Sequence, residues 1–169
     1  DHAIELTQTA RELSDAMLSA NVEQGRVDLQ SVLEDEVKEV QSSYPDATLK
    51  FGTSIPTVTL IANEMISSVF RNLLKNAIQH NDKDTAEVTI SITEYDDTVT
   101  VNIADNGPGV PDGQKETVFG KGEQGLDSSG TGMGLYLVDT LVSAYNGEVW
   151  IDDNEPEGAI FSVELPTQL

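Results

Sequence analysis

The chain has 169 residues, 38% of them hydrophobic, which suffices for one domain with a proper core. It has no cysteine and no apolar run of about 18 residues, which excludes disulfides, thiolate metal sites and a bilayer-spanning segment. Its 30 acidic residues outnumber 9 lysines and arginines, and the net charge of −21 makes nucleic acid and anionic lipid poor partners.

The acidic residues are scattered along the whole chain rather than collected in a tail. Self-repulsion of this size destabilises a compact state unless salt screens it, and at about 1 M salt the screening length is about 3 Å. We therefore expect a halophilic source, the alternative being an ordinary acidic cytoplasmic protein. A melting temperature that rises strongly with KCl would support the first interpretation, and a salt-independent one would exclude it.

Residues 1–20 are predicted to form a helix. Its apolar residues are spaced three and four apart, as in a heptad seam, at Ala3, Leu6, Ala10, Leu13, Met17 and Ala20. Fewer than three heptads leave two interpretations open: an amphipathic helix packed on its own domain, or the tail of a dimerisation hairpin. Residues 21–25 break the pattern and are predicted to be a linker.

The rest of the chain alternates between strand and helix patterns. Strands are predicted at 26–29, 48–55, 57–61, 87–95, 98–104, 148–152 and 159–165. Helices are predicted at 30–44, from a cap at Asn63 to about His80, and at 131–145. Residues 108–129 show little periodicity and are predicted to be a mobile lid. The expected fold class is α+β: a two-layer sandwich whose mixed, mostly antiparallel sheet is covered by helices on one face, with an N-terminal helical extension.

Three polar residues stand four positions apart in the helix that ends near His80. Steps of four turn a helix by about 40° beyond a full circle, so Asn72, Asn76 and His80 share one stripe. An amide oxygen suits Mg²⁺, which takes its other ligands from water and phosphate, and His80 could donate to a phosphate oxygen. A solvated polar face is the alternative interpretation of this helix alone.

A lone carboxylate follows the strand predicted at 98–104. Asp105 precedes Gly107 and Gly109, and glycines allow positive φ and let a flat ligand approach the backbone. A fixed carboxylate there can accept a hydrogen bond from the amino group of adenine. The alternative, a simple Asn-Gly turn, is weakened because no strand follows within hairpin distance.

A glycine-rich segment opens the helix predicted at 131–145. Its residues are Gly130, Thr131, Gly132, Met133, Gly134 and Leu135. Backbone N–H groups and the positive end of the helix dipole can face phosphate at such a start. The spacing is neither that of a dinucleotide-binding fingerprint nor that of a P-loop, and a flexible lid hinge is the alternative.

Together these motifs resemble the ATP-binding catalytic domain of sensor histidine kinases, in the superfamily shared with gyrase, Hsp90 and MutL. The resemblance covers about residues 26–169. It consists of an N box, a first glycine box, an F box and a second glycine box, at 72–77, 105–110, 118–122 and 130–135. The ending at 158–166 is also similar to the family's terminal strand.

The resemblance implies a role for each matching residue. Asn76 would coordinate Mg²⁺, Asn72 and His80 would help hold the phosphates of ATP, and Asp105 would read the adenine amino group. The other ATP-binding residues that it implies are Gly107, Gly109, Phe119, Lys121, Gly130, Thr131, Gly132, Met133, Gly134 and Leu135. Hydrolysing relatives carry a Glu at the position of Asn72. An amide cannot act as a base, which favours phosphoryl transfer to a protein over hydrolysis.

The resemblance also implies partners. Residues 1–25 are similar to the C-terminal part of a dimerisation and phosphotransfer helix with its linker, and 26–169 to the catalytic domain. The phosphoacceptor motif is absent, because His2 is not followed by an acid. The implied function is transfer of the γ-phosphoryl group to a histidine in the dimerisation domain of the same kinase, for relay to an aspartate of a response regulator receiver domain. We expect a cytoplasmic domain, a homodimeric full-length protein, and leave membrane association of that protein open.

Two positions depart from the family pattern, and two alternatives remain. Gln79 stands where Lys or Arg is frequent, and Gly120 where an acid is frequent. The alternatives are a serine protein kinase of the anti-sigma-factor type and a non-catalytic nucleotide-sensing module. The helical lead-in at 1–25 argues against the serine kinase.

Overall fold

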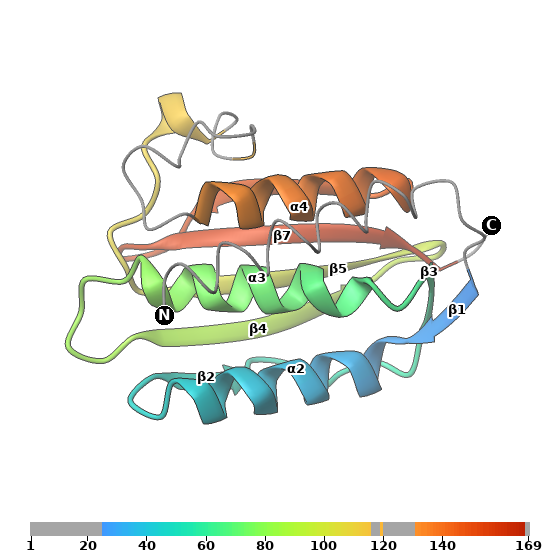
Figure 1. The fold of residues 1–169 in the computed structure, drawn as a ribbon, viewed down its shortest axis with the longest axis horizontal. Helices are drawn as coiled ribbons and strands as arrows, with labels where there is room; N and C mark the ends of the chain where they lie inside the picture. Colours follow the sequence, from blue (N-terminus) through green and yellow to red (C-terminus); the bar gives the residue numbers. More distant parts are fainter. Residues whose placement is uncertain (1–24, 116–118, 120–130, 168–169) are drawn as a thin grey trace.

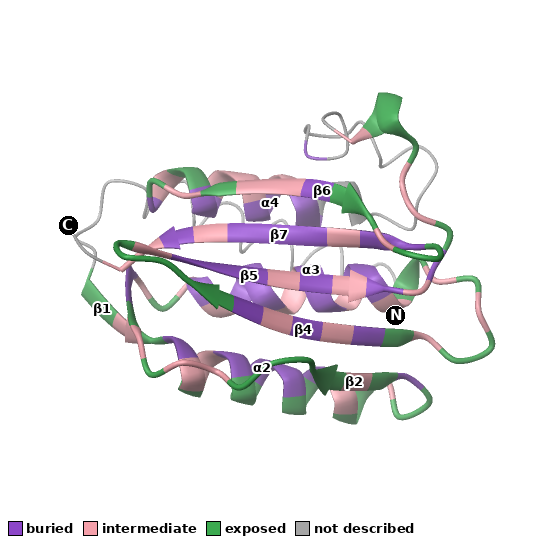
Figure 2. Ribbon diagram, turned by 180° about the vertical axis from the view of Figure 1, so that it is seen from behind, coloured by how far each residue is buried: buried purple, intermediate pink, exposed green. Residues whose placement is uncertain are grey.

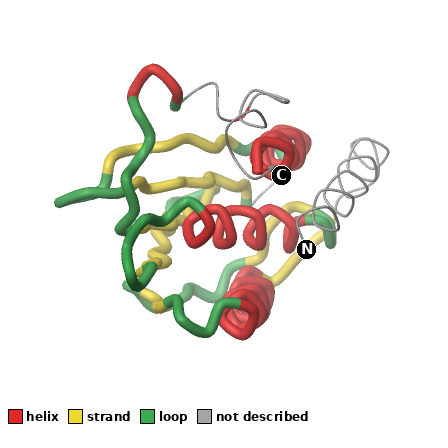
Figure 3. The backbone as a smooth tube through the Cα atoms, turned by 60° about the vertical axis from the view of Figure 1, so that its left-hand side comes forward, coloured by secondary structure: helices red, strands yellow, loops and turns green. Residues whose placement is uncertain are grey.

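The structure, a computed structural model, describes residues 25–115, 119 and 131–167, with side chains from 134 onward in the last range. The helix and linker predicted before residue 25 lie outside these residues, as does most of the predicted lid. Three helices, α2 (Leu29–Ser43), α3 (Ile66–Gln79) and α4 (Thr131–Ala144), lie side by side on one face of a sheet (Figures 1 and 3).

The main sheet has five strands in the order β2-β4-β5-β7-β6. Their bounds are Thr48–Phe51 (β2), Glu87–Glu94 (β4), Thr98–Asp105 (β5), Glu148–Asp153 (β6) and Ala159–Pro166 (β7). The pair β2–β4 is parallel, and the other three pairs are antiparallel. A separate antiparallel ribbon joins β1 (Gly25–Asp28) to β3 (Thr59–Ala62). The predicted α+β sandwich is confirmed, with helices on one face of a mixed sheet.

Alternation along the strands decides which side chains meet the helices, and Figure 2 shows the resulting bands of buried and partly exposed residues. In β5, Val99, Val101 and Ile103 are fully buried, and Asp105 continues the same row. On the opposite face, Asn102 accepts a hydrogen bond from the hydroxyl of Ser162 at 2.7 Å. The strand therefore delivers one carboxylate to the end of an otherwise apolar row under the helices.

The helices bury the apolar faces that their spacing predicts. Leu73, Leu74 and Ala77 of α3 are buried, and α2 contributes Leu29 and Leu33 to the same core cluster. The segment before β3 thus belongs to the same folded unit as the sheet. Among the described helices, none combines the length and the apolar character needed to cross a membrane.

The end of α4 follows the predicted pattern. Asn146 takes a positive φ of 64°, and the N–H of Gly147 donates to the carbonyl of Val142 at 2.9 Å. A left-handed residue directly after a helix is a common way to satisfy its last carbonyls. The sequence signal Asn146-Gly147 therefore marks the stop correctly, within one residue.

Two predicted boundaries are wrong. The strand predicted at 48–55 ends at Phe51, because the hydroxyl oxygen of Thr53, not a main-chain carbonyl, accepts the N–H of Ile92. Asn63 does not cap α3, which begins at Ile66. The side-chain oxygen of Asn63 instead accepts the N–H of Met65 in a tight turn, at 3.0 Å.

Lysines at two positions each bridge two carboxylates around the loops. Lys83 pairs with Asp82 and Glu157, and Lys115 pairs with Asp112 and Asp153. Exposed pairs of this kind contribute about 1 kcal/mol or less each, so they offset little of the acidic self-repulsion. The salt dependence of stability stays a prediction.

Candidate functional site

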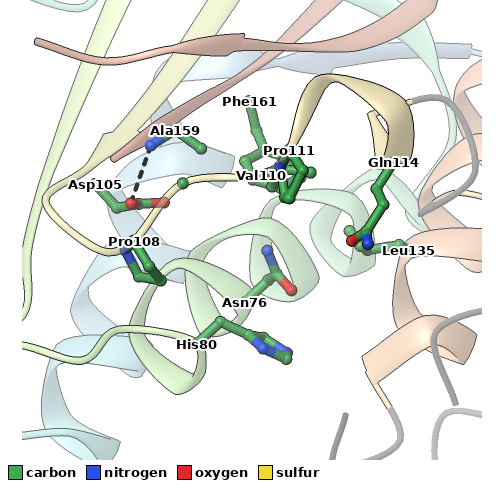
Figure 4. A pocket seen from close by; sticks show the side chains of 11 residues that line it. Asn76, His80, Asp105, Pro108, Val110, Pro111, Gln114, Leu135, Ala159 and Phe161 are labelled. Carbon is green, nitrogen blue, oxygen red and sulfur yellow. Dashed lines mark hydrogen bonds between the residues drawn. The ribbon is translucent and has the colours of Figure 1, made fainter. Parts of the chain in front are cut away.

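A cavity of about 200 Å³ opens between the last turns of α3, the end of β5 and the start of α4 (Figure 4). It is lined by Asn76, His80, Asp105, Pro108, Gly109, Val110, Pro111, Gln114, Leu135, Ala159 and Phe161. Residues far apart in the sequence therefore meet in one place, and five of the predicted site residues are among them.

Asp105 is the polar floor of this cavity. It is only 7% exposed, and its Oδ1 accepts the N–H groups of Gly107 at 2.9 Å and Ala159 at 3.2 Å. Burial raises the pKa of Asp105, while these two donors and the nearby His80 act in the opposite direction. Within the described part of the chain, Oδ2 accepts no hydrogen bond. One oxygen is thus fixed by the backbone, and the other is left for a ligand's donor.

Glycines let the backbone close around Asp105. Gly109 has a φ of 83°, and a Cβ there would lie 3.0 Å from the carbonyl oxygen of Gly158. Gly158 has a φ of 114°, and a Cβ there would overlap the carbonyl oxygen of Asp105. Both positions combine a left-handed backbone with a close approach, which is where glycine is needed. Of the two glycines that would allow a positive φ after Asp105, Gly109 adopts one and Gly107 does not.

The opposite wall comes from α3. Asn76 and His80 extend from successive turns towards the same space (Figure 4). Asn76 is buried, with 8% exposed, whereas His80 lies at the exposed mouth. The protein around the ring lowers the pKa of His80, and the carboxylate of Asp105 opposes that shift. The free protein therefore favours a neutral imidazole beside a buried amide.

Asn72, one turn earlier on the same stripe, has different surroundings. Its Nδ2 donates to the carbonyl of Ser68 at 2.7 Å. Its Oδ1 lies 2.6 Å from the point where a Cβ on Gly134 would stand. Asn72 is therefore in the contact between α3 and α4, and it is not among the residues that line the cavity. Its role in holding phosphate remains a prediction.

The remaining wall is apolar. Leu135, Val110 and Phe161 line it, and Phe119 packs edge-on against Phe161 with ring centroids 6.3 Å apart. An apolar slot beside one carboxylate suits a flat ring that carries a hydrogen-bond donor. Sequence reasoning missed six lining residues: Pro108, Val110, Pro111, Gln114, Ala159 and Phe161. Pro108 and Val110 lie in the first glycine box and Ala159 and Phe161 in the terminal-strand motif, but no chemically active side chain marked them.

Several predicted site residues cannot be placed in the cavity. Lys121 and Gly130 lie outside the described residues, and Thr131, Gly132 and Met133 are described only as the start of α4. Among described residues, no group of three or more His, Asp or Glu is placed to hold a metal ion. A cation here would need a donor set like the one predicted, an amide oxygen supplemented by a ligand's phosphates, and the buried amide of Asn76 fits that set.

Comparison with known proteins places this geometry in a family. The sequence model of the family described as histidine kinase-, DNA gyrase B- and HSP90-like ATPase matches residues 62–169. This range includes β4, β5, α3, α4 and the whole lining of the cavity.

Curated relatives are sensor kinases. The chain is 32% identical over 106 residues to the adaptive-response sensory kinase SasA of Synechocystis sp., covering 61% of this chain and 28% of that protein. It is 28% identical to the sensor protein KdpD of Escherichia coli, covering 99% of this chain and 19% of that protein. The chain thus spans less than a third of either relative. None of these matches supports a halophilic source.

Solved structures share the fold. The mycobacterial sensor histidine kinase MprB superposes with a TM-score of 0.76 at 22% identity, covering 86% of this chain and 98% of that one. Full-length ShkA, solved in complex with AMPPNP, gives a TM-score of 0.78 at 21% identity, covering 99% of this chain and 37% of that one. At these identities the likeness shows the architecture alone.

Proposed function

The chain belongs to the family of histidine kinase-, DNA gyrase B- and HSP90-like ATPases as a histidine kinase ATPase domain, and from this premise we propose that it binds ATP with Mg²⁺ in the cavity beside Asp105. The observation that carries the proposal is the meeting of Asp105, Asn76, His80 and Leu135 around one space. Each comes from a different motif or turn, and each supplies a different part of nucleotide recognition.

The adenine ring fits the apolar slot. Its exocyclic amino group would donate to Oδ2 of Asp105, while Leu135 and Phe161 cover the ring faces. The phosphates would then extend towards α3 and the start of α4, where backbone N–H groups favour anions. The orientation follows from Asp105, the one carboxylate among the described residues that line the cavity, since phosphates and a carboxylate repel each other.

Residues on α3 would hold the charged end. We propose that Asn76 is a ligand of Mg²⁺ and that His80 and Asn72 contact phosphate oxygens. The ion, when bound, supplies charge compensation for the triphosphate. The lid residue Lys121 would add a further positive charge. The contribution of the chain to phosphoryl transfer is then positioning and electrostatic stabilisation.

The phosphate acceptor would lie on another domain of the same kinase. We propose that residues 1–25 end the dimerisation helix, that 26–169 form the catalytic domain, and that the intact kinase is a homodimer. The γ-phosphoryl group would pass to a histidine of the dimerisation domain and then to a response regulator aspartate. Because the predicted heptad residues precede the first strand, separated from it only by the predicted linker at 21–25, a connection to such a domain is consistent with the sequence.

Calorimetry on the full chain tests nucleotide binding. ATP and ADP should bind saturably in Mg²⁺ at high salt, and binding should weaken when Mg²⁺ is removed. Absence of saturable uptake by a protein that shows a cooperative unfolding transition would refute the proposal.

Labelled ATP tests the transfer step when a separate acceptor-hairpin protein is supplied. Acid-labile, base-stable phosphohistidine on that protein supports the histidine kinase assignment. Phosphoserine on another substrate would support the serine kinase alternative, and bound nucleotide without transfer would support a sensing module. The sensor-kinase relatives favour the first outcome.

A further inference from the structure

The turn between β6 and β7 lies against the end of β5. Within it, the N–H of Asn154 donates to the carbonyl of Gly158 at 3.0 Å, and its Oδ1 accepts the N–H of Glu155 at 2.9 Å. Its Nδ2 donates across to the main-chain carbonyl of Asp105 at 2.7 Å. The Asn154 amide is therefore oriented by its own turn, and its donor is directed at the residue that forms the cavity floor.

The carbonyl of Asp105 needs this donor because the sheet ladder stops just before it. The register of β5 with β7 ends at the pair Ala104–Ile160. Asp105 would face Ala159 next in this register, but the N–H of Ala159 donates to the Oδ1 of Asp105 and not to its main-chain carbonyl. The side chain of Asn154 substitutes for the missing strand partner, and the approach is close enough that only glycine fits at Gly158.

The same turn also holds the carboxylate of Asp105. The N–H of Ala159, which follows the turn directly, donates to Oδ1. The main-chain carbonyl and one carboxylate oxygen are thus both fixed from the β6–β7 side. Fixing two points of one residue sets the direction of its remaining oxygen, Oδ2, which faces the cavity.

We propose that Asn154 is a positioning residue for base recognition: it fixes the backbone of Asp105 so that Oδ2 meets the exocyclic amino group of the bound purine. This inference rests on the proposed nucleotide site. Asn154 lines no part of the cavity, so its effect is transmitted through Asp105. Loss of its donor should loosen the carboxylate without removing the apolar slot or the groups on α3.

Two nucleotides that differ by one amino group isolate this effect. Calorimetry measures the dissociation constants of ATP and of purine riboside 5′-triphosphate, which lacks the 6-amino group, for the full chain in Mg²⁺. The dissociation constant of the purine analogue divided by that of ATP reports recognition of the amino group alone. A hydrogen bond to a charged acceptor contributes about 1.5–3 kcal/mol, a factor of about 10 to 150 in this ratio, so the partial loss in Asn154→Ala should lower the ratio about three- to ten-fold. The affinity for the purine analogue should stay within about two-fold.

Matched variants separate the donor from the turn. Asn154→Asp keeps the oxygen that accepts the N–H of Glu155 but has no donor, and it should lower the ratio like Asn154→Ala. Glu155→Gln, an exposed change in the same turn, should leave the ratio unchanged. Thermal unfolding of each variant confirms that it is folded.

The outcomes distinguish this inference from the proposed function. If the wild-type chain binds ATP and Asn154→Ala weakens both nucleotides equally, or neither, Asn154 is merely structural and the inference is wrong while the proposed function stands. If the folded wild-type chain binds neither nucleotide, the proposed function fails and the inference fails with it. A reduced ratio in both donor-free variants supports the inference.

Discussion

The two sides of the cavity hold their polar groups in different ways. On the strand side, Asp105 is fixed by N–H donors from Gly107 and Ala159. On α3, three residues of one stripe have three surroundings: Asn72 against α4, Asn76 buried in the cavity and His80 at its mouth. Eight residues of helix rise about 12 Å, so one stripe crosses several environments. A shared helical face therefore does not imply a shared site, whereas the end of a strand defines one point.

A substitution on the strand side of the cavity should cause the largest loss of ATP affinity. Asp105→Ala removes the acceptor for the adenine amino group and leaves the N–H groups of Gly107 and Ala159 without their carboxylate. Hydrogen bonds to charged groups contribute about 1.5–3 kcal/mol, so ATP affinity should fall by about 10- to 150-fold in calorimetry.

A polar residue on the other face of β5 provides the control for that prediction. Asn102→Ala removes the hydrogen bond to Ser162 but lies away from the cavity. Its ATP affinity should match that of the wild type. Unchanged affinity in Asp105→Ala would move the base site elsewhere, and the strand side of the cavity would then have no part in recognising the nucleotide.

Asn76→Ala should produce the next largest loss of ATP affinity, and it distinguishes Asn76 from Asn72 as the proposed Mg²⁺ ligand on α3. Mg²⁺-dependent ATP binding should fall by about ten-fold or more, because the proposed amide ligand is lost, while Mg²⁺-independent binding persists. The unfolding transition should remain cooperative. If Asn76→Ala keeps the full Mg²⁺ dependence and Asn72→Ala loses it, the metal site lies one turn earlier than we propose.

Much of the fold could be predicted because alternation and helical spacing act locally. The strand predicted at 98–104 is β5, with Val99, Val101 and Ile103 buried, and the structure extends it by one residue to Asp105, which continues that row. The shortened β2 could not be predicted, because the hydroxyl of Thr53 replaces a main-chain carbonyl only once β4 lies beside it. Asn63 was misassigned for a related reason, since its oxygen also accepts the hydroxyl of Tyr145 on a distant helix end, at 2.5 Å.

The site was predicted where a side chain carries chemistry and missed where shape or backbone does the work. Asp105, Asn76 and His80 were recognisable as a carboxylate, an amide and an imidazole in motifs. Ala159 acts through its N–H, and Asn154 acts through a turn whose position depends on the pairing of β6 with β7. Neither residue type nor spacing reveals such roles, because they arise only when separate strands meet.

The contact between α3 and α4 allows a test of the role of Asn72, which packs against Gly134 there. Gly134→Ala places a methyl group 2.6 Å from the Oδ1 of Asn72, closer than van der Waals contact, and we expect a loss of about 1–3 kcal/mol in the free energy of unfolding. In an Asn72→Ala background the clash is gone, and the same change should stabilise α4 by about 1 kcal/mol through helix propensity.

Urea unfolding of the four proteins in that cycle measures the coupling between the two positions. A coupling free energy of about 2 kcal/mol or more assigns Asn72 to helix packing. Additive effects, together with a ten-fold or greater loss of ATP affinity in Asn72→Ala, would assign it to the phosphates instead.

The smallest effect concerns the proton on His80 at the mouth of the cavity. Partial desolvation of the ring by the surrounding protein lowers the pKa of His80 from its ordinary value of 6.5 in the free protein. A neighbouring phosphate favours the charged imidazolium, so bound ATP should raise that pKa and binding near pH 6.5 should take up part of a proton. Calorimetry of ATP binding in buffers with different ionisation enthalpies measures this uptake, and His80→Asn should abolish it. Because ATP itself titrates near this pH, the difference between the two proteins is the deciding quantity. Equal uptake by both would place His80 away from the phosphates and leave Asn76 and Asn72 as the α3 residues proposed for the charged end of the nucleotide.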